Sequence, residues 1–147
     1  MRFYPLFIFP ILLLVSSCST FQPKHLTQGW KTVDLQVGGD GEMVEYIKSV
    51  FANYNLNNFR FEFLDDGTYK VNTPDGDTET GKWQIKKEEQ QLLMEGDNEK
   101  VEAFQVDILT KEQLEFHFEE DGAVFSFKLA RAESVSYTHL TLPTNGC

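Results

Sequence analysis

Apolar and polar residues alternate with a period of two through most of the chain from Gly29 onward. This period is typical of strands that bury one face and expose the other. It predicts an opening strand at about 30–37 and seven more, separated by short turns rich in Gly, Asp and Asn. The later strands are expected near 59–63, 68–71, 81–85, 91–95, 101–109, 114–118 and 125–129.

One segment between the first two strands has helical spacing instead. Its apolar residues recur three and four positions apart, as on one face of an amphipathic helix, and the Asn-rich stretch 55–58 would end it. We therefore expect a helix of about three turns over residues 42–55, covering a mouth of the sheet structure or packing on its outside. The predicted apolar face consists of Met43, Ile47, Val50 and Tyr54, with Val44 and Phe51 beside it.

Eight antiparallel strands with one apolar face can close into a barrel, which removes unpaired edges. The predicted fold class is therefore all-β, an antiparallel barrel of about eight strands with one helix between the first and second. A barrel of this size either fills with side chains or holds one small ligand, and the sequence does not separate these outcomes. The inward residues, and hence the candidate ligand-binding residues, are Phe61, Phe63, Trp83, Met94, Phe104, Phe116, Phe118, Phe125 and Phe127, with Ile108 on the same face.

Four short motifs occur in order along these strands. They are Gly29-Trp30-Lys31, Phe63-Leu64-Asp65-Asp66-Gly67-Thr68-Tyr69, Gly81-Lys82-Trp83 and Leu109-Thr110-Lys111-Glu112-Gln113-Leu114. Together they resemble the lipocalin-like domains of Bacteroidetes lipoproteins over roughly residues 26–130. The resemblance implies a lipocalin-like barrel, in which the helix at 42–55 is an insertion not shared by every member.

The first seventeen residues have the layout of a secretory signal peptide. Arg2 precedes an apolar run at 6–15, which is too short to span a bilayer. The sequence Leu-Val-Ser-Ser-Cys ending at Cys18 resembles a bacterial lipobox, which implies cleavage after Ser17 and acylation of Cys18. Two or three acyl chains anchor a protein stably, whereas one does not. The alternative is an uncleaved or ordinarily cleaved signal with an incidental cysteine.

The residues after the cysteine suggest where the lipoprotein resides. Ser19 stands where Asp would indicate retention in the inner membrane, so analogy favours the outer membrane. Residues 20–23 lack the acidic cluster associated with surface export, which favours a periplasm-facing position in the cell envelope.

The chain divides into four segments on this interpretation. They are a signal peptide (1–17), a lipid-anchored tether (18–28), the barrel (29–133) and a tail (134–147). The tail holds no charged residue and resembles translated sequencing-adapter read-through. The alternative is a genuine final strand, because Val135, Tyr137 and Thr141 have good β propensity.

Charge excludes some partners. With 13 Lys and Arg against 23 Asp and Glu, the net charge is -10, so we expect no nucleic-acid partner, since phosphate binding needs clustered cations. The acidic exterior also disfavours charged ligands, and any ligand bound through the membrane-anchored barrel should be small and hydrophobic.

No arrangement of residues indicates catalysis. Nearly all acids lie in turns or on the polar phase of strands, as Glu62 does. Asp75, Asp77 and Glu79 read as an acidic turn, because Gly81 falls one place too late for a calcium loop. Before the tail only His25 and His117 remain, which are too few for zinc or a serine triad.

We therefore expect no enzyme, metal or cofactor; inward-facing paired acids would point the other way. The favoured function is an outer-membrane lipoprotein whose barrel binds a small hydrophobic molecule. The alternative is a non-enzymatic envelope interaction or structural protein with a filled barrel, and no protein partner is identified.

Overall fold

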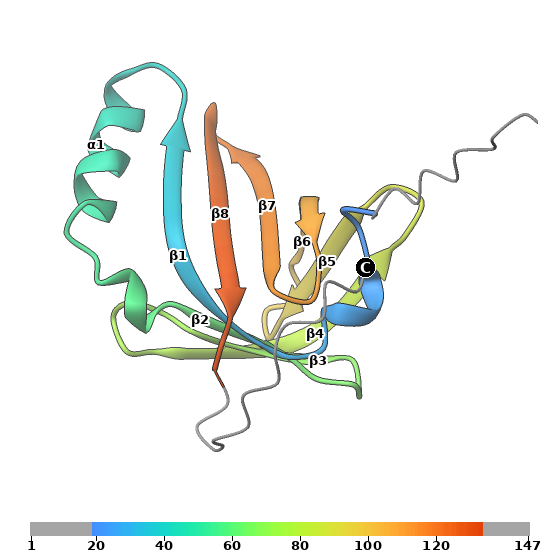
Figure 1. Cartoon of the computed structure of the whole chain (residues 1–147). Helices are drawn as coiled ribbons and strands as arrows, with labels where there is room; N and C mark the ends of the chain where they lie inside the picture. The colour runs from blue at the N-terminus through green and yellow to red at the C-terminus, as the bar shows by residue number, and fades with distance from the viewer. Residues whose placement is uncertain (1–18, 134–147) are drawn as a thin grey trace, which may run out of the picture.

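The computed structural model describes residues 19–133, so Cys18 and the tail from Ser134 lie outside the described residues. These residues form a closed barrel in which each strand pairs antiparallel with the next and the last closes on the first (Figure 1). The strands are β1 (Gly29–Gly38), β2 (Arg60–Phe63), β3 (Thr68–Asn72), β4 (Thr78–Lys86), β5 (Gln91–Gly96), β6 (Val101–Leu109), β7 (Gln113–Glu120) and β8 (Ala123–Arg131).

The helical elements are α1 (Glu42–Phe51), which lies between β1 and β2, and two 3-10 turns, η1 (Pro23–His25) and η2 (Leu56–Asn58). The eight strands, their closure and the position of the helix confirm the predicted fold class. This up-and-down connection of eight strands is that of lipocalins. Among residues 19–133, no helix is long and apolar enough to cross a membrane.

Aromatic rings fill the centre of the barrel. Phe116 is 2% exposed and stacks on Phe127 with ring centroids 5.0 Å apart. It also forms T-shaped pairs with Phe61 at 5.8 Å and Phe104 at 5.3 Å. Such pairs add stabilisation beyond the burial of their area, so the centre is held by a packed aromatic cluster.

A β-bulge in β6 changes which residues face the core. Val106 pairs with Phe116, but the register shifts before Ile108, because a bulge inserts one residue and reverses the inside–outside phase. Leu109 is fully buried and Ile108 is only half-buried. The prediction that Ile108 shares the inner face with Phe104 was therefore wrong.

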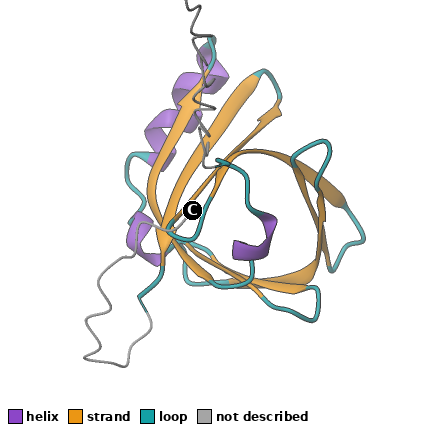
Figure 2. Ribbon diagram, turned by 45° about the vertical axis from the view of Figure 1, so that its right-hand side comes forward, coloured by secondary structure: helices purple, strands orange, loops and turns teal. Residues whose placement is uncertain are grey.

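The N-terminal segment closes one end of the barrel. Gln22 donates its backbone N–H to the Leu109 carbonyl at 2.7 Å, and Leu109 donates to the Thr20 carbonyl at 2.7 Å. Leu26 and Trp30 are fully buried, and the Trp30 indole Nε1 donates to the Leu26 carbonyl at 3.0 Å. Figure 2 shows the 3-10 turn of this segment lying across the barrel opening. Much of the expected tether thus packs against the domain.

Helix α1 is shorter than predicted and rotated. It ends at Phe51 rather than near residue 55. Val44 is 2% exposed, whereas Met43 is 62% exposed, so the buried stripe runs through Val44, Ile47 and Phe51. Successive helical residues differ by about 100° around the axis, so Met43 and Val44 cannot both face the barrel. Contact with the inner face of β1 selects the stripe that contains Val44. The prediction that Met43 belongs to the buried face was wrong.

The pairing between neighbouring strands of the barrel is shortest between β1 and β2. β1 pairs with β8 from Trp30 to Gly38, yet within the described chain its pairing with β2 covers only residues 29–31. The rest of β1 stands beside α1, visible at the left of Figure 1. The helix thus occupies the place where a longer β2 would complete the wall.

Candidate functional site

The nine residues predicted to bind a ligand lie together inside the barrel. Seven are buried, and Trp83 and Phe118 are partly buried against the same cluster. Phe118 stacks on Phe125 at 4.9 Å and meets Phe104 edge-on at 5.2 Å. Trp83 meets Phe63 edge-on at 6.1 Å, and its Nε1 donates to the Leu64 carbonyl at 3.0 Å. These residues contact mainly one another, so open volume must be sought at the margins of the cluster.

One such volume lies between α1 and the half of β1 that does not pair with β2, and we call it the helix groove. It encloses about 290 Å³. Phe51, on its wall, meets Tyr54 at 5.4 Å and the core residue Phe125 at 6.0 Å, so the groove borders the aromatic cluster directly. Its lining is mostly apolar and consists of Leu35, Val37, Phe51, Ala52, Tyr54 and Leu56, with Lys48.

A second volume, which we call the acidic cup, lies among β3, β4, β5 and β6. It encloses about 410 Å³. It involves the start of β6, whereas the N-terminal segment bonds the end of that strand, so the cup opens at the opposite end of the barrel. Tyr69 and Met94, 5% and 6% exposed, are its most deeply buried residues. The charged groups that line it are Glu79, Asp97, Glu102 and Lys100.

A glycine positions Tyr69 beneath the cup. Tyr69 pairs with Gly81, and Gly81 with Gly96, across three strands. A Cβ on Gly81 would overlap the Glu95 carbonyl oxygen and lie 2.8 Å from the Tyr69 hydroxyl. The absence of a side chain at Gly81 therefore leaves room for the Tyr69 ring beside β4, with its hydroxyl close to Gly96. Burial, followed by the charges of Glu79, Glu102 and Asp97, raises the pKa of Tyr69.

The carboxylates of the cup face inward, contrary to the prediction that nearly all acids lie in turns or on the outward phase of the strands. Glu79 is in phase with Gly81 and Trp83, and Glu102 with Phe104. Lys100 Nζ lies 3.1 Å from Glu102 Oε1. A proton-donating carboxyl is typically kept in dry, apolar surroundings, but Glu79 and Glu102 are exposed. The arrangement suits recognition of charge better than proton transfer.

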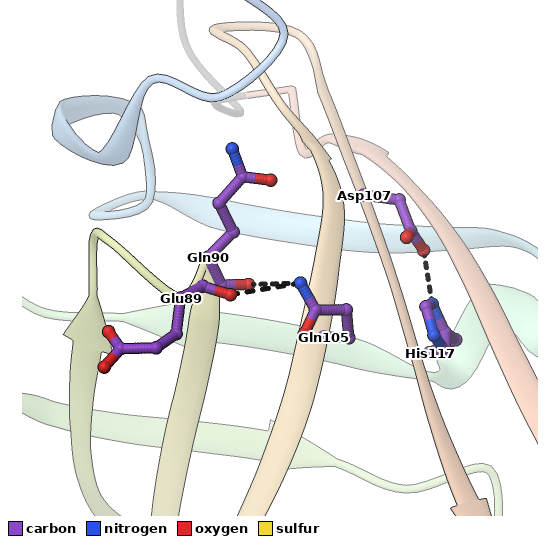
Figure 3. A network of polar contacts seen from close by, with 5 residues as sticks. All are labelled: Glu89, Gln90, Gln105, Asp107 and His117. Carbon is purple, nitrogen blue, oxygen red and sulfur yellow. Dashed lines mark hydrogen bonds and ion pairs between the residues drawn. The ribbon is translucent and has the colours of Figure 1, made fainter.

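A polar cluster lies on the outer face of β6 and β7 (Figure 3). His117 Nδ1 is 2.7 Å from Asp107 Oδ2, and Gln105 Nε2 donates to the carbonyls of Glu89 at 3.2 Å and Gln90 at 3.3 Å. The Gln105 bonds hold the β4–β5 turn, where Gln90 has a φ of 52°. The cluster thus fixes the turn and the strand register.

Three side chains of the kinds found in serine triads occur on this outer face. Ser126 lies opposite His117 on β8, which places a serine, a histidine and an aspartate near one another. A triad also needs a pocket and oxyanion donors, and His117 lines neither the helix groove nor the acidic cup. Among residues 19–133, no group of three or more His, Cys, Asp or Glu could hold a metal ion.

Comparisons with known proteins identify no family for this chain. No protein-family model matches the chain, and no curated protein is significantly similar to it. Two solved structures are similar. One is a lipocalin-like protein from Bacteroides uniformis ATCC 8492, with a TM-score of 0.48 and 14% identity, covering 74% of this chain and 99% of its own. The other is an uncharacterized protein from Bacteroides eggerthii DSM 20697, with a TM-score of 0.49 and 10% identity, covering 73% and 99%.

Proposed function

We propose that this protein is a lipid-anchored outer-membrane lipoprotein whose barrel binds a small apolar molecule in the helix groove. The observation that carries the proposal is an apolar groove of about 290 Å³ beside an already packed core. Ligand cavities are typically concave, mainly apolar and about 300–1,000 Å³ in volume, so the groove suits a small ligand. Removing such a ligand from water supplies the binding free energy.

The groove exists because β2 is short. Leu35 and Val37 pair with Phe127 and Phe125 on β8, so their side chains share the inner face with those rings. Beyond residue 31, however, β2 provides no wall for them. α1 and η2 supply that wall with Phe51, Tyr54 and Leu56, and their imperfect fit leaves space that an apolar molecule can fill.

The groove can be tested by filling it. Ala52 is an exposed helix-terminal residue on the groove margin, so Ala52→Trp adds bulk there without opening the core. The full chain is titrated with the uncharged fluorophore N-phenyl-1-naphthylamine, whose emission rises in apolar surroundings. We expect Ala52→Trp to weaken binding about tenfold or more, because a blocked pocket loses most of its buried ligand area.

The matched control is Ala103→Trp, which places the same bulk on the exposed outer face of β6. It should bind the probe as the unaltered chain does. Equal affinity in both variants, or no binding by the unaltered chain, would contradict the groove as the binding site.

The membrane anchor is tested separately. Cys18→Ser should abolish both incorporation of radiolabelled palmitate and recovery of the protein in the outer-membrane fraction, since a single thiol carries the proposed thioether. Persistence of both signals would overturn the proposed lipidation.

A second candidate function is an envelope interaction protein with a filled barrel. The packed aromatic centre favours it, together with Met43 and Tyr46 on α1, which are 62% and 66% exposed. Native mass spectrometry of protein isolated from its natural host separates the candidates. A reproducible small-molecule adduct supports the binding module, whereas a protein adduct lost in Tyr46→Lys, without a small-molecule adduct, supports the alternative.

A further inference from the structure

The acidic cup combines a deep, largely apolar floor with a negatively charged rim. Tyr69 and Met94 are almost completely buried at its base. Glu79, Asp97 and Glu102 line the walls, while Lys100 is the one cationic side chain among the lining residues of the described chain. The net charge of the lining is therefore negative, in a concave site where neighbouring walls concentrate the field.

Tyr69 is an almost completely buried residue whose hydroxyl faces this cup. The residue is 5% exposed, and no residue in the range 19–133 forms a hydrogen bond with its hydroxyl. The oxygen itself is open to the cup, because among the described residues the fully buried side-chain polar atom without a partner is Thr32 Oγ1 and not this hydroxyl. The hydroxyl lies beside Gly96, which also lines the cup, so a ligand there has an oxygen acceptor at the bottom of the site.

Lys100 already shows how an ammonium group sits at this rim. Its Nζ lies 3.1 Å from Glu102 Oε1, and this hydrogen bond raises the pKa of Lys100. Both side chains are more than half exposed, so the pair is weak and exchangeable. An incoming ammonium group can replace Lys100 at Glu102 without breaking any buried interaction.

We propose that the acidic cup is a second ligand site, specific for a small organic cation in which a protonated amine carries a short apolar portion. The ammonium group is held by Glu79, Glu102 and Asp97 and donates to the Tyr69 hydroxyl, while the apolar portion rests on Met94. The expectation that the acidic exterior disfavours charged ligands then holds for anions only. This site is separate from the helix groove, because the two volumes share no lining residue.

Three probes with the same apolar portion test the charge requirement. The full chain is titrated by calorimetry with 4-phenylbutylamine, 4-phenylbutanol and 4-phenylbutyrate, which are cationic, neutral and anionic. We expect the amine to bind at least tenfold more tightly than the alcohol and the carboxylate not to bind detectably, because the carboxylates attract one charge and repel the other. Equal binding of amine and alcohol would overturn the proposal.

Variants identify the groups responsible. Glu79→Gln should weaken binding of the amine about three- to tenfold and leave that of the alcohol unchanged, since exposed charges interact modestly. Lys100→Gln should strengthen binding of the amine by a similar factor, because it removes the competing ammonium group. Glu88→Gln, at an exposed turn outside the cup, is the matched control and should change nothing. An unchanged amine affinity in both Glu79→Gln and Lys100→Gln would refute the site.

The outcome is independent of the helix groove. Ala52→Trp should leave amine binding intact, and saturating amine should not displace N-phenyl-1-naphthylamine. Loss of amine binding in Ala52→Trp would place the amine in the groove and overturn the proposal for the cup. Failure of the fluorophore to bind, with amine binding retained, would refute the groove alone.

Discussion

Phe116→Ala should reveal whether the centre of the barrel is packed. Phe116 is 2% exposed and contacts the rings of Phe127, Phe61 and Phe104 at centroid distances of 5.0 to 5.8 Å. Truncation of a buried Phe to Ala costs about 3–5 kcal/mol, because it loses transfer free energy and leaves a cavity. Lost ring contacts place this site at the upper half of that range. A domain of this size is stable by about 5–15 kcal/mol, so the loss is large but measurable.

The assay is equilibrium unfolding in urea, followed by fluorescence of the buried Trp30. A slope of about 1–3 kcal/mol per molar urea converts the loss into a fall in midpoint of roughly 2 M. Phe116→Leu, which keeps most of the volume, should cost about 1–1.5 kcal/mol. Glu119→Ala, on the exposed outer face of the same strand, should lie within about 0.5 kcal/mol of the unaltered chain. A loss below about 1 kcal/mol for Phe116→Ala, at unchanged slope, would refute the packed centre and indicate room for a ligand there.

Three further predictions concern single contacts. Gly81→Ala should lower the free energy of unfolding by about 1–3 kcal/mol, because its Cβ would overlap a backbone oxygen. Gly38→Ala is the control and should be nearly neutral, because its Cβ would meet nothing closer than 3.9 Å. Equal melting temperatures for the two variants would contradict this prediction. Trp30→Phe should cost about 0.5–1.5 kcal/mol in urea unfolding, since it removes the indole hydrogen bond to the Leu26 carbonyl, which then keeps only the Gln28 backbone N–H as a donor; no loss would mean that the N-terminal segment is not docked. The folded state raises the pKa of Tyr69 from its ordinary value of 10.0, chiefly by burial. The folded chain therefore holds the phenol proton more tightly than the unfolded chain does, so the free energy of unfolding should fall as the pH rises above 10.0. Tyr69→Phe should show a shallower fall between pH 9 and 11, and an identical pH slope would count against the raised pKa.

The sequence predicted the strands well because inside and outside are chemically distinct in this barrel. Phe61 and Phe63 alternate with Arg60 and Glu62, so the period of two was enough to predict both the strand and its buried face. Such alternation is local information, readable without knowledge of the partner strand. Closure of the ring followed from the number of strands and from the cost of leaving edges unpaired.

Features that depend on distant contacts could not be read in the same way. The bulge that buries Leu109 instead of Ile108 is set by pairing with β7. The choice between Met43 and Val44 on α1 is set by packing against β1, because both residues have acceptable helical spacing. In each case a long-range contact selects between two local patterns that the sequence leaves nearly equivalent.

The candidate site was predicted only in part. The aromatic residues do lie inside the barrel, but they pack together, and the open volumes lie at the margins of the cluster. The acidic cup had an available signal, because Glu79 and Glu102 occupy the inward phase of their strands, unlike Glu62 on the outward phase. No sequence pattern indicated the helix groove, since the groove arises from the short pairing between β1 and β2.

That short pairing has a consequence for how the chain avoids self-association. Over most of its length β1 presents one row of backbone groups that β2 does not pair with, and such a row readily recruits a strand from another molecule. α1 stands in front of it. The helix therefore covers an open strand edge in addition to forming a groove, and undocking it, without unfolding any strand, would expose that edge to a strand from another molecule.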